Sequence, residues 1–562
     1  MSEKPWFKFY PEGIPKSIPY PEVPLPQLLR DTAKKHPDHV ALIFEDYKIT
    51  YRELDELVDR FATALHDLGI SKGDVVALFL PNIPQFVITY YGILRVGGIV
   101  TAINPLYKER EVEYQLNNAE AKAIVTLDIL YPTVKKVWKK TKVKSVIITS
   151  LKDYLPPVKR ILGTLLGKIP TAKVEREPGV YFLKELLARY PPEPPKVEID
   201  PKEDLAVLQY TGGTTGVPKG AMLTHYNLVA NAIGAMYWLR AREAEDVHMG
   251  VLPLFHIYGM TTVMNSSIYG AGTVVLIPRF DPEKILSSIE KYKVTVFCGV
   301  PTLYAVLITH PKIDEYNLRS IKFCISGAAP LPPEVQKRFM ELTGAVLVEG
   351  YGLTEASPVT HANPLDPTMK TVKVGTIGIP WPDTDAKIVD PETGTKELPP
   401  GEVGELVVKG PQVMKGYWKM PEETKATLRD GWLYTGDLAT VDEDGYFRIV
   451  DRKKDLIKYK GYSVYPRELE DVLYEHPAVK LCAVVGKPDP VAGEIPKAFI
   501  VLKPEYEGKV KEEEIIEWVK ERVAPYKRIR EVEFRRELPL TTVGKVLRRV
   551  LREEELKKAK AK

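Results

Sequence analysis

The sequence is short of cysteine and of net charge. Its three cysteines, Cys298, Cys324 and Cys482, lie far apart and show neither metal-ligand nor disulfide spacing, which is typical of a protein in a reducing cytoplasm. The 79 basic residues are balanced by 75 acidic ones, which leaves a net charge of +4. This near balance gives no sign of nucleic acid as a partner, so we expect a cytoplasmic protein that binds no nucleic acid.

Signals for secretion and for a membrane span are also missing. The first residues, MSEKPWFKFYPEG, lack the apolar centre of a signal peptide. The uncharged run from Val294 to Thr309 is interrupted by Gly299 and Pro301, and it predicts a strand, a turn and a helix rather than a membrane span. Glutamine is scarce, whereas Lys, Glu and Pro are abundant, a composition typical of thermophiles.

What remains is the composition of an ordinary globular protein. Its 562 residues, 44% hydrophobic and 27% charged, predict more than one domain. Apolar spacing predicts helices over 25–36 and 51–69, the second opened by a capping box from Thr50 to Glu53. The strand candidates VVALFL, IVTAIN and AKAIVTL alternate with helices, which predicts a largely parallel α/β sheet. Helices and strands over 457–562 predict a second, smaller α/β domain.

One stretch carries the strongest chemical signal. Tyr210 to Gly220 reads YTGGTTGVPKG and lies between a strand candidate and a helix candidate. Its glycines allow the backbone to approach a ligand closely, and its threonines and Lys219 supply donors and charge, as a phosphate cradle needs. It is not a Walker A loop, because Val217 and Pro218 precede the lysine. For this loop taken alone, a glycine-rich surface turn is the alternative.

The string as a whole resembles the phosphate loop of the adenylate-forming enzymes, the superfamily of acyl-CoA synthetases, luciferases and adenylation domains. Further stretches follow in the order of that superfamily: FHIY from residue 255, SGAAPL from 326, GYGLTE from 350, YTGD from 434, DRKKD from 451 and PLTTVGK from 539. The stretch from Asp430 to Pro466 resembles the signature region of fatty acyl-CoA synthetases. The resemblance covers residues 25–552.

For the fold, the resemblance implies an α/β protein with a large N-terminal domain over 1–450, in which several subdomains hold mixed sheets flanked by helices. A hinge over 451–456, centred on Lys454, would join this domain to a small mobile α/β domain over 457–562. The small domain would carry Lys545, which the family's PLTTVGK-type motif marks as the catalytic lysine.

For the chemistry, the resemblance implies ATP, Mg²⁺ and coenzyme A. It assigns the phosphates of ATP to the loop residues Thr211, Gly212, Gly213, Thr214, Thr215, Gly216 and Lys219. It assigns the rest of the nucleotide, and part of the acyl chain, to Gly327, Ala328, Ala329, Pro330, Glu349, Gly350, Tyr351, Gly352, Asp437 and Arg452. Candidates for coenzyme A and further cofactor contacts are Arg279, Lys458, Lys460 and Gly461. The implied metal ligands are Glu355 and Thr214, and the implied catalytic residues are Lys545, Glu355, Thr354 and His256.

Two of these residue assignments have a plainer alternative, and the substrate class has an alternative as well. His256 in an apolar run fits a hydrogen-bonded core histidine as well as a lining of the acyl tunnel, and Arg279 fits an ordinary surface arginine. The resemblance favours a medium- or long-chain fatty acid as substrate, with an aryl-CoA ligase of the 4-coumarate type as the alternative. An adenylation domain that serves a carrier protein, and a silent nucleotide- or lipid-binding protein, are the other classes left open.

Residues 150–200 interrupt the alternation of strands and helices. YLPPVKRILGTLLGKIP mixes basic residues with a compact apolar set, and membrane-associated fatty acyl-CoA synthetases resemble this chain here. The stretch therefore predicts either a peripheral contact with a membrane or a partner through 154–170, or a surface subdomain that covers an apolar wall. A homodimer is also left open.

Overall fold

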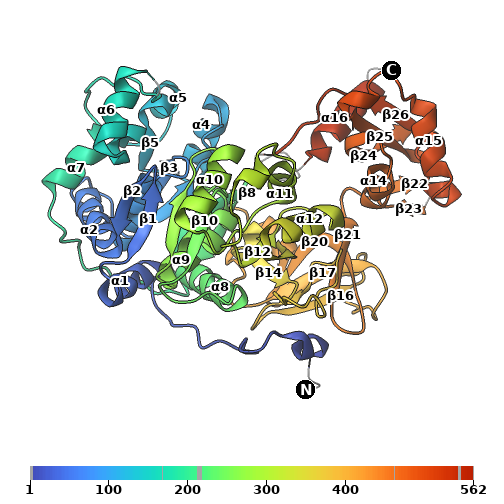
Figure 1. Cartoon of the computed structure of the whole chain (residues 1–562), viewed down its shortest axis with the longest axis horizontal. Coiled ribbons are helices and arrows are strands. Elements are labelled where there is room, and N and C mark those ends of the chain that lie inside the picture. The colour runs from blue at the N-terminus through green and yellow to red at the C-terminus, as the bar shows by residue number, and fades with distance from the viewer. Residues whose placement is uncertain (1–3, 168, 212–217, 461, 542–545, 561–562) are drawn as a thin grey trace. The chain divides into compact units, whose positions relative to one another are not determined.

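The computed structural model describes residues 4–167, 169–211, 218–460, 462–541 and 546–560 (Figure 1). The chain forms two compact units. The large unit consists of Phe7–Asp385 and Lys409–Leu433, and the small unit of Met1–Trp6, Ala386–Val408 and Tyr434–Lys562. Helices accompany sheets in both units, so the predicted α/β class is confirmed. Among the described residues, no helix is both long and apolar enough to pass through a membrane.

The large unit contains an eight-stranded sheet in the order β18-β9-β8-β4-β3-β5-β6-β7. Its parallel strands are β3 (Val75–Phe79), β4 (Ile99–Ala102), β5 (Ala123–Leu127), β6 (Ser145–Thr149), β7 (Val180–Phe182) and β8 (Leu205–Thr211). β9 (Lys219–Thr224) runs antiparallel to β8, and β18 (Gly416–Tyr417) runs antiparallel to β9. Two antiparallel strands therefore complete one edge of the sheet, next to the candidate phosphate loop.

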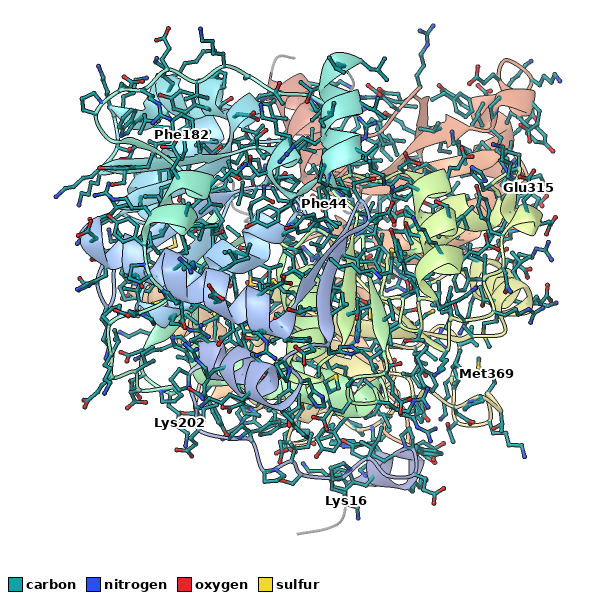
Figure 2. All side chains as sticks on the ribbon, turned by 60° about the vertical axis from the view of Figure 1, so that its left-hand side comes forward. Lys16, Phe44, Phe182, Lys202, Glu315 and Met369 are labelled. Carbon is teal, nitrogen blue, oxygen red and sulfur yellow. The ribbon has the colours of Figure 1, made fainter. Side chains whose placement is uncertain are left out.

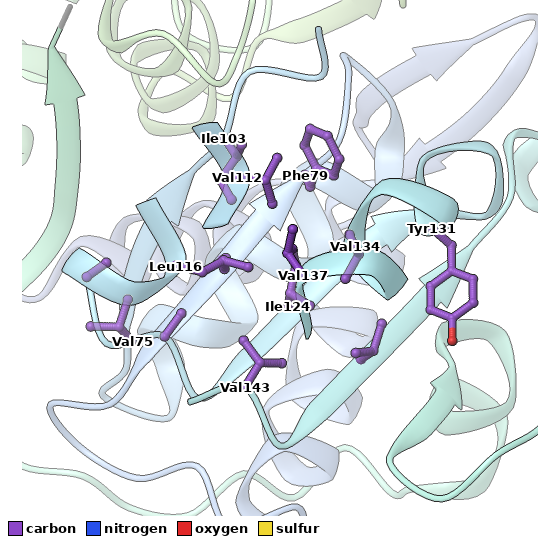
Figure 3. Packing of buried hydrophobic residues seen from close by; sticks show 14 of the residues in the cluster. Val75, Phe79, Ile103, Val112, Leu116, Ile124, Tyr131, Val134, Val137 and Val143 are labelled. Atoms are coloured by element: carbon purple, nitrogen blue, oxygen red, sulfur yellow. The ribbon is translucent and has the colours of Figure 1, made fainter. Parts of the chain in front are cut away.

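An apolar cluster fills one side of this sheet. Val75, Ala77 and Phe79 of β3 face the same side because side chains alternate along a strand, and they pack with residues of α4 (Glu109–Asn118) and α5 (Tyr131–Trp138) (Figure 3). α3 (Pro84–Arg95) contacts β3 and β4 but contributes nothing to this cluster, which places it on the opposite face. The sheet is thus covered on both faces, as parallel sheets usually are.

Two four-stranded sheets complete the large unit. The first, in the order β10-β11-β1-β2, contains β1 (Val40–Phe44), β2 (Tyr47–Thr50), β10 (Val247–Gly250) and β11 (Thr273–Leu276). The second, in the order β12-β13-β14-β15, contains β12 (Phe323–Ser326), β13 (Val346–Gly352), β14 (Val359–Ala362) and β15 (Ile379–Pro380). Among the side chains labelled in Figure 2, Lys16, Lys202 and Glu315 are exposed, whereas Phe44 at the end of β1 is buried.

Helices surround these sheets. They are α1 (Leu25–Lys35), α2 (Tyr51–Asp67), α6 (Pro157–Leu165), α7 (Leu183–Arg189), α8 (His225–Trp238), α9 (Ser266–Tyr269), α10 (Pro282–Tyr292), α11 (Pro301–Ile308), α12 (Pro333–Thr343) and α13 (Pro421–Thr427), the last followed by the short strand β19 (Leu428–Arg429). A π-helical stretch, η4 (Gly259–Asn265), leads into α9, and short 3-10 turns include η6 (Thr354–Ala356).

The small unit has its own sheet in the order β23-β22-β25-β24, with β26 beside β25. Its elements are β22 (Ile457–Tyr459), β23 (Tyr462–Val464), β24 (Val479–Asp489), β25 (Gly493–Leu502), β26 (Glu531–Phe534), α14 (Pro466–Tyr474), α15 (Glu512–Lys520) and α16 (Arg548–Lys560). Val484 and Ile500 share a cluster with α14 and α15, whereas Val485 and Phe499 share a cluster with Leu551 of α16. The alternation of the two long strands therefore builds two apolar layers. Further strands are β16 (Asp385–Val389), β17 (Gly404–Lys409), β20 (Trp432–Val441) and β21 (Phe447–Arg452).

Strong local patterns predicted these elements well, and two weaker ones did not. The capping box of α2 is present, because the Glu53 carboxylate accepts from Thr50 N at 2.8 Å and Thr50 Oγ1 accepts from Glu53 N at 3.3 Å. The apolar run VVLIPRF predicts a strand that ends at Arg279, but β11 ends at Leu276, because Pro278 has no N–H to continue the ladder. Within 150–200, the stretch 154–170 contains the short helix α6, which buries none of its residues, whereas β7 continues the large sheet and α7 buries Leu183, Leu186 and Leu187.

A buried histidine joins two helices of the large unit. α1 begins at Leu25, and the Leu25 N–H, which has no partner within its own helix, donates to Nδ1 of His225 at 3.1 Å. His225 is 1% exposed, and the loss of hydration lowers its pKa to about 4. The folded protein therefore keeps His225 neutral, with Nδ1 as an acceptor, at pH values where an unfolded chain would protonate it.

His225 should make the protein acid-sensitive. An unfolded histidine titrates near pH 6.5, so between pH 6.5 and about 4 the unfolded chain binds a proton that the folded chain does not, and the free energy of unfolding falls as pH falls. From pH 7 to pH 5 this loss is about 2 kcal/mol. His225→Asn keeps an acceptor but does not titrate in this range. Between pH 7 and pH 5 its free energy of unfolding, measured with urea, should therefore fall by about 2 kcal/mol less than that of the wild type. Exposed His66→Asn is the control, and an unchanged pH slope in His225→Asn would contradict this account.

Candidate active site

The candidate phosphate loop joins two paired strands. β8 and β9 are antiparallel, and Thr211 at the end of β8 lies opposite Lys219 at the start of β9. The predicted loop residues Gly212, Gly213, Thr214, Thr215 and Gly216 lie outside the described residues. The strand pairing nevertheless brings the two described ends of the loop together. Gly220 is needed there, because a Cβ would lie 3.2 Å from the ring of Tyr210.

The Lys219 side chain is enclosed by a segment that comes from far along the sequence. Its Nζ forms an ion pair with the Glu423 carboxylate of α13 and lies 5.2 Å from the centre of the Tyr417 ring. Tyr417 belongs to β18, whose backbone pairs with β9 so that Tyr417 lies opposite Ala221. The Lys219 side chain is only 14% exposed. A charge this close to a ring face is attracted by the ring quadrupole.

The same tyrosine contacts the candidate metal ligand. Tyr417 Oη donates to Oε1 of Glu355 at 2.7 Å, and Met414 N donates to the Glu355 carbonyl at 2.8 Å. Burial and the neighbouring Glu355 carboxylate raise the pKa of Tyr417, so its hydroxyl stays protonated and remains a donor. The edge of the sheet thus carries a chain of contacts that runs from Glu355 through Tyr417 and Lys219 to Glu423.

The donor set around Glu355 fits a magnesium ion shared with a phosphate ligand. Within the described ranges, no cluster of three or more His, Cys, Asp or Glu residues could hold a metal by itself. Mg²⁺ commonly uses one or two carboxylates, substrate phosphates and waters rather than an all-protein cage. The partly exposed Glu355 carboxylate, with Lys219 held beside the same tyrosine, matches that pattern. Thr214, the other predicted ligand, lies outside the described residues.

The GYGLTE stretch runs from β13 into η6. Tyr351 pairs with His361 of β14, and their rings meet edge to face with centroids 6.1 Å apart. A Cβ on Gly350 would lie 2.8 Å from Ile325, and a Cβ on Gly352 would lie 2.3 Å from the Pro358 carbonyl oxygen. The two glycines therefore allow β13 to pack closely against its neighbours, and Thr354 follows as the first residue of η6.

The predicted shelf, Gly327 to Pro330, follows β12 and is fixed from two sides. On one side the buried Glu349 accepts a hydrogen bond from Leu331 N at 3.0 Å. On the other side Tyr258 of the FHIY stretch donates to the Ile325 carbonyl at 2.8 Å, and a Cβ on Gly327 would lie 3.1 Å from its ring. Ala328 has φ +70°, a conformation that residues with a side chain rarely adopt. Ala329 lies between these anchors.

His256 belongs to a stretch whose other residues contact both β12, which leads into this shelf, and the phosphate-loop strand. Its Nδ1 accepts from Tyr258 N at 3.3 Å, and desolvation lowers its pKa to about 4, so the ring is neutral at neutral pH. Gln209 of β8 donates through Nε2 to the carbonyl of the preceding Phe255 at 2.9 Å. Arg279, by contrast, is exposed beyond the end of β11, and no described residue forms an ion pair with it.

The remaining candidates belong to the small unit. Asp437 and Arg452 lie opposite each other on β20 and β21, with Oδ1 and Nε 3.4 Å apart. Lys458 Nζ donates to Ser463 Oγ at 3.0 Å, and Lys460, with φ +49°, donates its N–H to the Ala492 carbonyl at 2.8 Å. The predicted site residues Gly461 and Lys545 lie outside the described residues.

The predicted hinge is flanked by a buried ion network. Arg548 of α16 binds Asp451 at 2.9 Å and also pairs with Glu470 of α14. Partial loss of hydration and the nearby Arg452 lower the pKa of Lys454 to about 8. Arg552 donates to the Lys454 carbonyl at 2.8 Å. The start of the 451–456 segment is therefore tied to the helices of the small unit.

Sequence reasoning missed three residues of this arrangement. Tyr417, Glu423 and Gln209 were not singled out, although each contacts a predicted site residue or its neighbour. A usable signal existed only for Glu423, because PEE followed by Thr is typical of a helix start with acidic residues in its first turn. Strand β9 was also missed, because the loop was expected to lie between a strand and a helix, with no second strand after it.

Comparison with known proteins adds an independent observation. The model of the "AMP-binding enzyme" family matches residues 29–418, and that of the "AMP-binding enzyme C-terminal domain" matches residues 468–545. A long-chain-fatty-acid–CoA ligase of Bacillus subtilis is 48% identical over 99% of both chains. A probable 4-coumarate–CoA ligase 1 of Dictyostelium discoideum is 35% identical over 96% of both chains.

A solved structure agrees with these matches. An anthranilate CoA ligase in complex with anthranoyl-AMP superposes with a TM-score of 0.82 at 28% identity, over 96% of this chain and 99% of that one. The order of motifs, the fold and the sequence matches point the same way, and the chain belongs to the AMP-binding enzyme family.

Proposed function

We propose that this protein activates a fatty acid with ATP and transfers it to coenzyme A. The first step gives an acyl-adenylate and pyrophosphate, and the second gives acyl-CoA and AMP. The observation that carries this proposal is the 48% identity, over 99% of both chains, to a protein named long-chain-fatty-acid–CoA ligase. The relative named as a 4-coumarate–CoA ligase is more distant, at 35%, so an aryl acid is the less supported substrate.

The first step brings two anions together, because a carboxylate must attack the α-phosphate of ATP. Fixed positive charge and donors placed where negative charge accumulates lower such a barrier. In the proposal, Lys219 and Thr211 hold the phosphates that leave as pyrophosphate, Thr354 donates to the α-phosphate, and Glu355 holds Mg²⁺. When bound, Mg²⁺ would neutralise phosphate charge. Tyr351 and the shelf from Gly327 to Pro330 would receive adenine, and Asp437 with Arg452 the ribose.

The second step needs a thiol at the carbonyl that the first step activated. In the proposal, Lys545 approaches the carboxylate and the α-phosphate during adenylation, and rotation about 451–456 then replaces it with the face around Lys460. Hinge rotation about a few residues is an ordinary form of domain closure. The domain limits at 450 and 457, and the roles of Lys454, Lys458, Gly461 and Arg279, remain part of this proposal. The homodimer, the cytoplasmic location and the thermophilic origin stay predictions.

The substrate class is tested by measuring product formation. We expect pyrophosphate release with medium- and long-chain fatty acids when coenzyme A is omitted, at one equivalent per site, because the adenylate stays bound. Added coenzyme A should convert this burst into steady turnover. The panel should include hydroxycinnamates. A preference for hydroxycinnamates over every fatty acid in kcat/KM would reject the fatty-acid assignment, and steady turnover without coenzyme A would reject the two-step scheme.

Lys545→Ala separates the two half-reactions. Adenylate formation should fall by about 10²–10³-fold, because one fixed positive charge at the transferring group is lost. Thioester formation from supplied acyl-adenylate should persist, since the lysine has withdrawn by then. Single-turnover assays of each step give the comparison, with Lys503→Ala as a surface control. Equal losses in both steps would show that Lys545 does not alternate.

We also propose that helix α6 rests on a membrane surface, where the fatty acid substrate is dissolved. Its apolar side chains Val158, Ile161, Leu162, Leu165 and Leu166 are 53–78% exposed. On its other side, Lys159 forms ion pairs with Glu45 and Asp46 in the turn between β1 and β2. Residues 154–174 contain four basic residues and no acidic one, which suits an anionic lipid surface.

Leu162→Gln/Leu165→Gln should weaken this contact. Each replacement removes an apolar side chain that would enter the lipid, so binding to vesicles rich in phosphatidylserine should fall at least about 10-fold. Co-sedimentation measures this, while activity on a soluble medium-chain acid without vesicles should be unchanged. Val491→Gln removes a residue that is 83% exposed in the small unit and is the matched control. Equal sedimentation of all three proteins would remove the membrane proposal.

A further inference from the structure

Lys219 has an anionic partner before any nucleotide is present. Its Nζ pairs with the Glu423 carboxylate, and its cation lies against the Tyr417 ring. If Lys219 binds the phosphates of ATP, as the proposed function requires, it already holds a carboxylate at the position from which it must reach them. The anion that ATP brings and the anion of Glu423 therefore compete for one ammonium group.

The geometry keeps Glu423 within reach of Lys219. Thr424, the next residue, accepts a hydrogen bond from Tyr417 N at 2.9 Å and donates to the Met420 carbonyl at 2.8 Å. Gly416 allows the close approach, because its φ is +146° and a Cβ would lie 2.7 Å from Thr424. The first turn of α13 is thus fixed to β18, which is itself paired with the strand that carries Lys219.

The two ends of the ion pair differ in their exposure. The Lys219 side chain is 14% exposed, whereas the Glu423 side chain is 45% exposed. Glu423 can therefore return to water when Lys219 leaves it, whereas Lys219 without an anion would remain a poorly hydrated charge. A buried cation needs a partner, and an ion pair with one exposed member is weak enough to exchange.

We propose that Glu423 is the resting counter-ion of Lys219 and that ATP binds by displacing it. Glu423 then takes the place of a phosphate beside Lys219, keeps Lys219 oriented along the Tyr417 ring, and lowers the affinity for ATP by the strength of the exchanged pair. This inference rests on the proposed function, because it takes Lys219 as a phosphate ligand. It adds a role for α13, whose Glu423 contacts Lys219 directly.

Glu423→Gln removes the competing charge and keeps the shape. We expect it to bind the α,β-methylene analogue of ATP, which cannot form an adenylate, about 2- to 5-fold more tightly than the wild type at low salt. Isothermal titration calorimetry with Mg²⁺ measures this. Near 1 M salt the difference should disappear, because salt screens the pair that the variant lacks.

Glu422→Gln is the matched control. Glu422 is the preceding residue of the same helix turn, its side chain is 86% exposed, and its nearest cation is Lys425 at 3.9 Å. The affinity of the Glu422→Gln variant for the analogue should equal that of the wild type. A thermal melt adds a readout that a merely structural role would not produce. Without ligand, Glu423→Gln should have a lower melting temperature than the wild type. The same concentration of the analogue should nevertheless raise its melting temperature by more than it raises that of the wild type.

The outcomes separate the inference from the function beneath it. If the wild type binds the analogue and Glu423→Gln binds it equally or more weakly, Glu423 is no counter-ion for Lys219 and the inference fails, while the proposed function stands. If the wild type does not bind the analogue at all, the proposed function fails and the inference fails with it. If Glu423→Gln, but not Glu422→Gln, binds the analogue more tightly than the wild type, and if this difference disappears at high salt, the result supports both the inference and the proposed function.

Discussion

The candidate site depends on one pairing, that of β8 with β9. Because Thr211 lies opposite Lys219, the two described ends of the candidate phosphate loop lie together at the edge of the large sheet. β9 then serves as the template for β18, which places Tyr417 beside Lys219 and within 2.7 Å of the Glu355 carboxylate. Backbone hydrogen bonds thus decide where the charged side chains meet. The side chains add little stability of their own at these partly exposed positions.

The charged groups at this edge already have partners within the protein. One lysine stands between two carboxylates, Glu423 directly and Glu355 through the tyrosine. One positive and two negative side chains do not attract a polyanion by net positive charge. They offer exchangeable partners instead, a lysine that can leave its carboxylate and a carboxylate that can accept a metal. Under the proposed function, ATP arriving with Mg²⁺ would supply both replacements at once, which would explain why an acidic residue lies so close to the proposed phosphate ligand Lys219.

The sequence predicted what is decided locally and missed what is decided at a distance. The capping box of α2, strand β3 and the helices of the small unit follow from patterns within a few residues, and each was found. The motif order also predicted Lys219 and Glu355 for one site, and both contact Tyr417 in the structure. β18 is two residues long and pairs with a strand almost 200 residues earlier, as the contact between Tyr417 and Ala221 shows. No periodicity reveals such a pairing, because a two-residue strand is stabilised by its template and not by its own propensity.

Helix α6 shows the same limit in another form. Its sequence gives an amphipathic helix whether the apolar side packs inward or outward, so the pattern alone left both interpretations open. The deciding contact is made by the polar side. Lys159 binds Glu45 and Asp46, two residues with positive φ that form the tight turn between β1 and β2. Anchored by its charge, the helix must turn its leucines to the outside. An apolar surface that is held outward by specific ion pairs, rather than left over by poor packing, calls for an apolar partner, and the proposed membrane contact would supply one in the bilayer that dissolves a fatty acid.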